Sequence, residues 1–271
     1  MLQQQLAPFK VIVRPFKRLM QRKLDQRVCA LGLTPITEFV EDDVLIAGYP
    51  KSGNTWFQNL ITGVIYGIDA DYASDALIQD LVPDVHYKSY YNRYGTPMFF
   101  KSHNLPQPEN RRVVYLLRDG RDVMVSYFHY LTALNGKEIN FLEMVQAGKG
   151  LYPCKWHEHV EAWLSNPYHV QMLIIRYEDL KINTVKELRR FCEFIGVERD
   201  DPLLESAAAK ASFEKMRLRE KTSGWSDSQW PKDKAFVRRG QVHSYKDEMP
   251  PHILETFLED ANVTLLKLGY I

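Results

Sequence analysis

Short apolar runs alternate with longer amphipathic segments along this chain. The runs stop at Gly, Pro or charged residues and predict buried strands at 44–47, 98–101, 112–117 and 171–177. Apolar residues at helical spacing predict helices at 55–65, 123–131, 185–195 and 251–269. Strands that alternate with helices form a mostly parallel sheet covered on both faces. We therefore expect an α/β fold, a single domain with a central, mostly parallel sheet flanked by helices.

The first part of the chain differs from the rest in charge. Residues 1–37 hold seven basic residues against one acidic residue, Asp25. Apolar residues recur among these charges at near-helical spacing, at Phe9, Val13, Phe16, Met20 and Leu24. A basic amphipathic helix can lie on an anionic membrane surface, or it can pack on its own domain and expose its charges. We predict a basic amphipathic arm over 1–37, a candidate for peripheral membrane contact, and one domain over 38–271.

Composition excludes several classes of protein. Of the 271 residues, 45% are hydrophobic and 25% charged, with 35 basic and 34 acidic residues. This balance excludes a chain that is disordered throughout and argues against a nucleic-acid-binding protein. Cys29, Cys154 and Cys192 lie far apart without a CxxC pair, so we expect reduced thiols. The chain has no transmembrane-length apolar run and no signal-peptide pattern, so a cytoplasmic setting is expected.

A glycine-bearing loop follows the first predicted strand. Residues 48–55 fit the phosphate-loop frame G-x-x-x-x-G-K-[ST], except that Asn54 stands where the lysine is expected. Backbone N–H groups of such a loop, with the positive end of the helix behind it, bind phosphate. The lysine of this loop, Lys51, would reach a phosphate from another direction. The pattern favours a nucleotide with a shorter or differently modified phosphate arm than ATP, although a strand–helix connection without a ligand can carry the same glycines.

Basic residues follow two further elements. Arg118 comes directly after the strand over 112–117, at the sheet edge where open α/β proteins bind ligands. Arg238, Arg239 and Gly240 lie within 219–247, a polar segment for which we predict an ordered or a lid-like loop. Guanidinium groups make paired, charge-assisted hydrogen bonds, so both places are candidates for phosphate binding.

A lysine and a histidine mark the end of the second predicted strand. Lys101 and His103 are two residues apart, so in an extended chain their side chains face the same way. A histidine of near-neutral pKa can take a proton from a hydroxyl group. His103 is therefore a candidate general base at the same edge as the phosphate loop.

Six ordered motifs resemble those of the cytosolic-type sulfotransferases, which use 3′-phosphoadenosine 5′-phosphosulfate (PAPS). Residues 49–56 are similar to the family's 5′-phosphosulfate loop YPKSGTTW, and residues 101–106 to its KTHLP segment with Asn104 inserted. The other similar segments are 117–129 to the 3′-phosphate motif, 176–180 to the YEDL stretch, 212–216 to SFxxM and 238–246 to RKGxxGDWK. Order and approximate spacing hold from about residue 40 to the C-terminus. The resemblance identifies 38–271 as a sulfotransferase domain with a P-loop-like phosphate-binding loop.

The resemblance implies a reaction. The protein would transfer a sulfuryl group from PAPS to a hydroxyl, or to an amine, by in-line displacement without a metal ion. The nucleotide product would be 3′-phosphoadenosine 5′-phosphate (PAP). His103 would act as the general base, and Lys51 and Lys101 would stabilise the transferring group.

The resemblance also implies the nucleotide site. Trp56 and Phe213 would sandwich the adenine, and Arg118, Ser126 and Arg238 would hold the 3′-phosphate. The implied nucleotide site comprises Lys51, Ser52, Gly53, Asn54, Thr55, Trp56, Arg118, Ser126, Tyr177, Ser212, Phe213, Arg238, Arg239 and Gly240.

The sequence departs from the family pattern at its end and in its acceptor region. His243, Ser244 and Tyr245 replace a Gly, an Asp and a Trp of the last motif, and the family's dimer motif KxxxTVxxxE is missing after Lys246. The oligomeric state therefore stays open. The short stretch between 66 and 98 is rich in side chains that could line an acceptor pocket or simply pack, at Tyr72, His86, Tyr87, Tyr90, Tyr91 and Tyr94. The acceptor is expected to be a small molecule or lipid with a hydroxyl group.

Two other functions compete with sulfuryl transfer. A P-loop kinase-like phosphotransferase would use the 48–55 frame with Mg-ATP, and Asn54 speaks against it. A non-catalytic nucleotide-binding homologue associated with a membrane is suggested by the basic arm.

Overall fold

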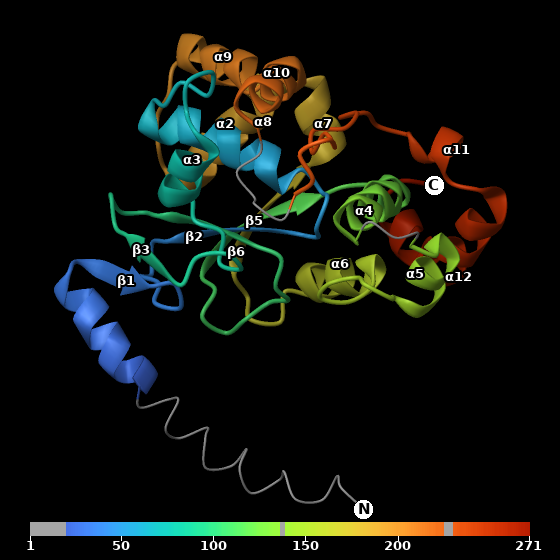
Figure 1. Cartoon of the computed structure of the whole chain (residues 1–271), viewed down its shortest axis with the longest axis horizontal. Coiled ribbons are helices and arrows are strands. Elements are labelled where there is room, and N and C mark those ends of the chain that lie inside the picture. Colours follow the sequence, from blue (N-terminus) through green and yellow to red (C-terminus); the bar gives the residue numbers. More distant parts are fainter. Residues whose placement is uncertain (1–19, 136–138, 225–229) are drawn as a thin grey trace, which may run out of the picture.

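A parallel sheet forms the centre of the computed structural model, which describes residues 20–135, 139–224 and 230–271 (Figure 1). Its strands are β2 (Val44–Gly48), β4 (Phe99–Ser102), β5 (Arg112–Leu117) and β6 (Gln171–Arg176), in the order β4-β2-β5-β6. All neighbouring strands of this sheet pair in parallel. The predicted fold class is confirmed, with the second predicted strand one residue later than expected.

Side chains of β2 alternate between the two faces of the sheet. Val44 and Ile46 belong to an apolar cluster with residues of α2 (Asn54–Tyr66) and α8 (Thr184–Ile195). Leu45 and Ala47 belong to a second cluster with residues of α4 (Gly120–Asn135) and α12 (Pro251–Lys267). Because both faces are buried, the strands are continuous apolar runs rather than alternating patterns.

The remaining helices complete the two layers. They are α3 (Asp75–Leu81), α5 (Phe141–Ala147), α6 (Trp156–Leu164), α7 (Tyr177–Ile182), α9 (Asp201–Lys210), α10 (Phe213–Ser223) and α11 (Tyr245–Glu248). Helices α2, α3, α8, α9 and α10 lie on one side of the sheet, and α4, α5, α6 and α12 on the other (Figure 1). The carboxyl ends of β2, β4 and β5 therefore lie at one edge of the sheet, between the two layers of helices.

The segment 219–247, predicted as a loop, is helical at both of its ends. Residues 219–223 belong to α10, and Tyr245 begins α11. The side chain of Ser212 accepts a hydrogen bond from the backbone of Lys215 and so caps the start of α10. Charged residues surround this helix on most sides, so it lacks the apolar stripe by which helices are recognised in a sequence.

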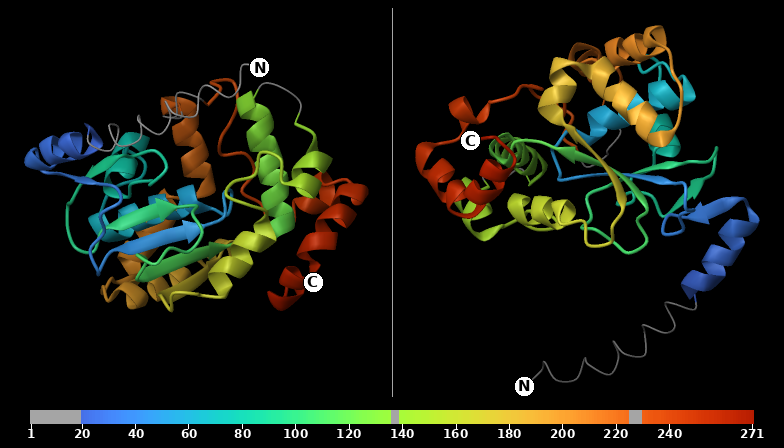
Figure 2. Two further views of the ribbon diagram at one scale, coloured as in Figure 1. Left: turned by 90° about the horizontal axis from the view of Figure 1, so that it is seen from below. Right: turned by 180° about the vertical axis from the view of Figure 1, so that it is seen from behind.

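The end of the predicted arm is joined to the domain by strand pairing. Strand β1 (Leu33–Pro35) pairs antiparallel with β3 (Tyr90–Asn92). Residues 20–30 form a helix that extends from this pair away from the sheet (Figure 2), while residues 1–19 of the arm lie outside the described residues. The Tyr90 hydroxyl donates to Asp25 at 2.9 Å and accepts from Gln21 at 3.0 Å. Among the described helices none combines the length and apolar character needed to cross a membrane.

Candidate active site

The phosphate loop links β2 to α2 through a tight left-handed turn. Lys51 and Gly53 have φ angles of 73° and 96°. A Cβ atom at Gly53 would lie 2.7 Å from the Tyr177 ring, so glycine is required there for backbone and packing reasons. The side-chain Nδ2 of Asn54 donates to the Tyr49 carbonyl at 3.0 Å and closes the loop. Asn54 therefore stabilises the loop itself, whereas the lysine at this position of a P-loop reaches the ligand.

Several buried polar atoms around the loop lack a partner among the described residues. They are Ser52 Oγ, Asn54 Oδ1 and Arg118 Nε. Buried polar groups are usually hydrogen-bonded, and those left over mark the place of a ligand or water. At the start of α2, backbone N–H groups add to these atoms. The loop therefore has the features of an anion-binding site.

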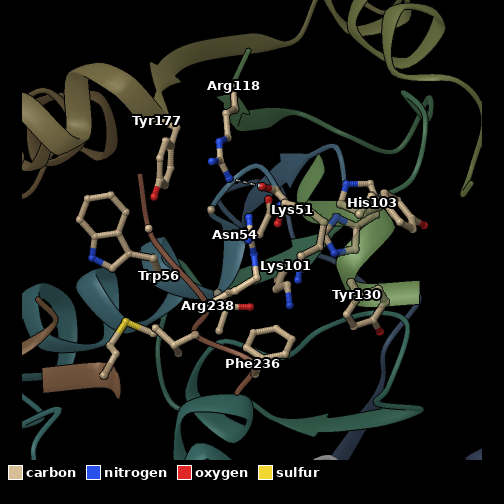
Figure 3. A pocket seen from close by; sticks show the side chains of 18 of the residues that line it. Lys51, Asn54, Trp56, Lys101, His103, Arg118, Tyr130, Tyr177, Phe236 and Arg238 are labelled. Carbon is tan, nitrogen blue, oxygen red and sulfur yellow. Dashed lines mark hydrogen bonds between the residues drawn. The ribbon is translucent and has the colours of Figure 1, made fainter. Parts of the chain in front are cut away.

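Arg118 connects the phosphate loop with the segment around Gln241. Its guanidinium donates to the Lys51 carbonyl at 3.0 Å and to the Gln241 carbonyl at 2.9 Å. The same group stacks 4.2 Å from the centre of the Tyr177 ring. These contacts fix the guanidinium beside the loop, as the sequence predicted for its position at the end of β5 (Figure 3).

Lys51 is enclosed by aromatic rings. Its Nζ lies 4.5 Å from the ring centre of Tyr130 and 4.4 Å from that of Phe236 (Figure 3). Burial, together with the charges of Lys101, Arg118 and Arg238, lowers the pKa of Lys51 to about 7. A bound anion would reverse that shift, because it would stabilise the charged ammonium.

His103 is held in one tautomer. Its Nδ1 lies 2.7 Å from the Gly48 carbonyl oxygen, which can only accept, so Nδ1 carries the hydrogen and Nε2 the lone pair. Its backbone N–H donates to Nε2 of His86 at 3.0 Å, and the two rings stack with centres 5.6 Å apart. Burial and the charge of Lys101 lower the pKa of His103 well below its ordinary value. The imidazole is therefore neutral at neutral pH and can accept a proton.

Two aromatic side chains from different elements form the opposite end of the site. Trp56 in α2 donates through Nε1 to the Ala211 carbonyl at 2.8 Å. Phe213 begins α10, and Nζ of Lys181 lies 5.6 Å from the Trp56 ring and 6.0 Å from the Phe213 ring. Both rings border the same cavity, an arrangement suited to a flat aromatic base between them.

Arg238 and Arg239 share one carboxylate. Both donate to Glu248, at 2.5 Å and 2.7 Å. Burial raises the pKa of Glu248, but hydrogen bonds from Arg238, Arg239 and His129 outweigh it and hold the pKa at about 2. A phosphate at this place would share the two guanidinium groups with an ionised Glu248.

One cavity of about 690 Å³ joins these parts. Of the implied site residues it is lined by Lys51, Gly53, Asn54, Thr55, Trp56, Lys101, His103, Arg118, Ser126, Tyr177, Phe213, Arg238, Arg239 and Gly240. Ser52 is buried behind the loop, and Ser212 caps α10, so neither lines the cavity. Within the described ranges no cluster of His, Cys, Asp and Glu is suited to a metal ion.

Some residues that line the cavity lie outside the sequence motifs and were not predicted. Tyr130, Phe236 and Lys181 line the cavity and contact site residues, and Tyr152 lines it beside His86, with ring centres 5.4 Å apart. An aromatic or a lysine between motifs looks like any other packing or surface residue in the sequence. Only the folded arrangement brings these side chains to the site.

Comparison of the sequence with known proteins finds one protein family. The sequence model of the sulfotransferase domain matches residues 41–267. Sulfotransferase 1E1 of Bos taurus is 28% identical over 240 residues, which cover 80% of this chain and 81% of that protein. Sulfotransferase 1C2 of Homo sapiens is 28% identical over 229 residues, or 76% of this chain and 77% of that protein.

Solved structures share the fold at low sequence identity. Retinol dehydratase in complex with androsterone and the inactive cofactor PAP has a TM-score of 0.64 and 22% identity, covering 84% of this chain and 82% of its own. Mouse sulfotransferase SULT7A1 complexed with PAP has a TM-score of 0.62 and 21% identity, covering 83% and 86%.

Proposed function

Because this chain belongs to the sulfotransferase domain family, we propose that it transfers a sulfuryl group from PAPS to an acceptor hydroxyl or amine. The observation that carries the proposal is one cavity whose lining includes four basic side chains and a neutral histidine. These side chains are Lys51, Lys101, Arg118 and Arg238. PAPS supplies the activated sulfuryl group, and the protein supplies binding, orientation and the base.

The cavity fits a nucleotide with two phosphate positions. The loop amides, Lys51 and the unpartnered Asn54 oxygen suit the 5′-phosphosulfate end. Arg118, Ser126 and the Arg238–Arg239 pair suit the 3′-phosphate, which ATP lacks. Trp56 and Phe213 suit the adenine. Two structures of the same fold contain PAP, retinol dehydratase and mouse sulfotransferase SULT7A1, which supports the proposal.

His103 is proposed as the general base. Its Nε2 carries the lone pair and would take the proton of the acceptor as the acceptor oxygen forms its bond to sulfur. Lys51 and Lys101 would hold the sulfuryl oxygens and the charge that develops on the leaving phosphate oxygen. This scheme uses no metal ion.

The acceptor is proposed to be a small molecule or a lipid with a hydroxyl group. Retinol dehydratase, which shares the fold, has structures in complex with androsterone and with retinol. The cavity lining includes His86, which stacks on His103, together with Tyr87 and Tyr152. A cytoplasmic setting with peripheral membrane contact stays part of the proposal, and the oligomeric state stays open.

Sulfate transfer from labelled PAPS to a pooled acceptor library, read by mass spectrometry, tests the proposal. We expect a sulfated product, and calorimetry should detect binding of PAP but not of Mg-ATP. Binding of Mg-ATP in preference to PAP would favour the kinase-like function. Binding of PAP without transfer to any acceptor class would favour the non-catalytic homologue.

A further inference from the structure

A buried carboxylate lies directly behind the candidate catalytic lysine. Asp84 follows α3 and has 0% of its surface exposed. Its segment runs parallel to β4: the Lys101 N–H donates to the Pro83 carbonyl at 2.9 Å, and the Val85 N–H to the Lys101 carbonyl at 3.0 Å. Backbone pairing therefore fixes Asp84 beside Lys101.

The Asp84 carboxylate contacts two parts of the site. One oxygen lies 2.9 Å from Nζ of Lys101, and the other accepts the backbone N–H of His86 at 2.9 Å. Burial by itself raises the pKa of Asp84, but the charge of Lys101 and the hydrogen bond from the His86 backbone outweigh it and lower the pKa. Asp84 is therefore an ionised group at the base of a cation-rich cavity.

Lys101 is itself almost fully buried, with 6% of its surface exposed. A lysine has a flexible four-carbon stem and a strongly hydrated ammonium, so a buried position needs a partner to hold the group in place. The ammonium has three hydrogens, and at most one of them faces Asp84, whose Oδ2 makes an ion pair at 2.9 Å without the geometry of a hydrogen bond. The other hydrogens remain for groups inside the cavity that Lys101 lines.

We propose that Asp84 is a positioning residue that holds the Lys101 ammonium in line with the transferring sulfuryl group. The proposal rests on the sulfuryl transfer proposed above. The ion pair has almost no net charge, so Lys101 contributes directed hydrogen bonds. The net positive charge that attracts the nucleotide comes from the other basic side chains of the cavity. Asp84 therefore affects turnover and not nucleotide affinity.

A double-mutant cycle between Asp84→Asn and Lys101→Met tests the coupling. We expect Asp84→Asn to lower kcat by roughly tenfold or more, since a displaced catalytic group loses its alignment. The Kd of PAP, measured by calorimetry, should stay within about threefold or tighten, because a negative charge is removed from an anion site. In the Lys101→Met background, Asp84→Asn should change kcat by less than about twofold.

Asp80→Asn is the matched control. Asp80 lies in α3, the helix that precedes Asp84, and pairs with Lys88 at 2.5 Å. Its side chain is 48% exposed. The same change of charge at Asp80 should therefore leave kcat and the PAP affinity unchanged. A kcat of Asp84→Asn close to the wild-type value overturns the inference. So does a further loss in the Lys101→Met background, or a parallel loss of PAP affinity. If the wild-type protein does not bind PAP, the proposed function itself fails.

Discussion

At the scale of single residues, the position of His103 depends on side chains from another element. The Nε2–H group of His159 in α6 donates to the His103 carbonyl at 3.2 Å, and the Tyr115 hydroxyl donates to Nδ1 of His159 at 3.0 Å. Trp163 of the same helix donates to the Asn104 carbonyl at 3.1 Å. Helix α6 therefore fixes the backbone that carries the candidate base.

Replacing His103 by glutamine separates proton transfer from position. The glutamine amide can still donate to the Gly48 carbonyl but cannot take a proton. We expect His103→Gln to lower kcat by roughly 10²- to 10⁴-fold, with the Kd of PAP within about threefold of wild type. Steady-state kinetics and calorimetry measure the two quantities.

His157→Gln on α6 is the control, since His157 lies outside the cavity lining and should have no effect. Because the pKa of His103 is lowered, the base stays neutral above that pKa and is lost only as the pH falls through it. Protonation of His103 should therefore not reduce the wild-type kcat/KM between about pH 8 and pH 6. Full turnover of His103→Gln would show that another group is the base.

At the scale of elements, α10 and the segment after residue 230 meet at one glycine. Gly240 has a φ of 60°, and a Cβ atom there would lie 2.4 Å from the Phe213 ring. Phe213 is the first residue of α10 and one wall of the proposed adenine site. This close approach connects the proposed phosphate and adenine contacts.

Gly240→Ala should therefore displace Phe213. We expect the Kd of PAP to weaken by roughly tenfold or more, because stacking on an aromatic side chain contributes about 1–3 kcal/mol per base. Fluorescence titration or calorimetry with PAP measures the change.

Gly196→Ala controls for backbone strain. Gly196 ends α8 with a φ of 72°, and no atom lies within 4 Å of the added Cβ. This variant should lose about 1 kcal/mol of folding stability and bind PAP normally. If the two variants bind PAP equally well, the contact with Phe213 does not matter for the nucleotide.

At the scale of the whole molecule, one basic helix lies at the edge of the domain and contacts it through Tyr90. The helix over 20–30 leaves Met20 52% and Leu24 48% exposed. Arg22, Lys23 and Arg27 follow on the same helix. Helices that combine apolar and basic side chains can lie on an anionic bilayer, which motivates a test of the proposed membrane contact.

The full-length protein is expected to bind vesicles that contain phosphatidylserine more strongly than vesicles of phosphatidylcholine alone. Replacing Arg22, Lys23 and Arg27 together by glutamine should weaken binding by roughly tenfold or more, since each basic residue contributes about 1 kcal/mol. Cosedimentation measures the partition. Val263→Gln, at an exposed apolar position of α12, is the control and should bind as wild type. Equal binding to both kinds of vesicle would contradict a role of this helix in binding anionic membranes.

The sequence alone determined the family, the parallel sheet and the phosphate loop. These features are local: a buried strand is an apolar run, and a phosphate loop has glycines at fixed spacing before a Ser or Thr. The helix α10 was missed because its charged surface has no apolar stripe, and Ser212 proved to be a helix cap outside the cavity lining.

Only the tertiary structure decided which groups support the site. Asp84 pairs with Lys101 from a different segment, and Tyr130 and Phe236 enclose Lys51 although 106 residues separate them. No spacing rule connects such residues, because their contacts depend on how the helices pack over the sheet edge. The motifs identify the groups that meet the nucleotide, and the packing determines the charge, tautomer and position in which those groups are held.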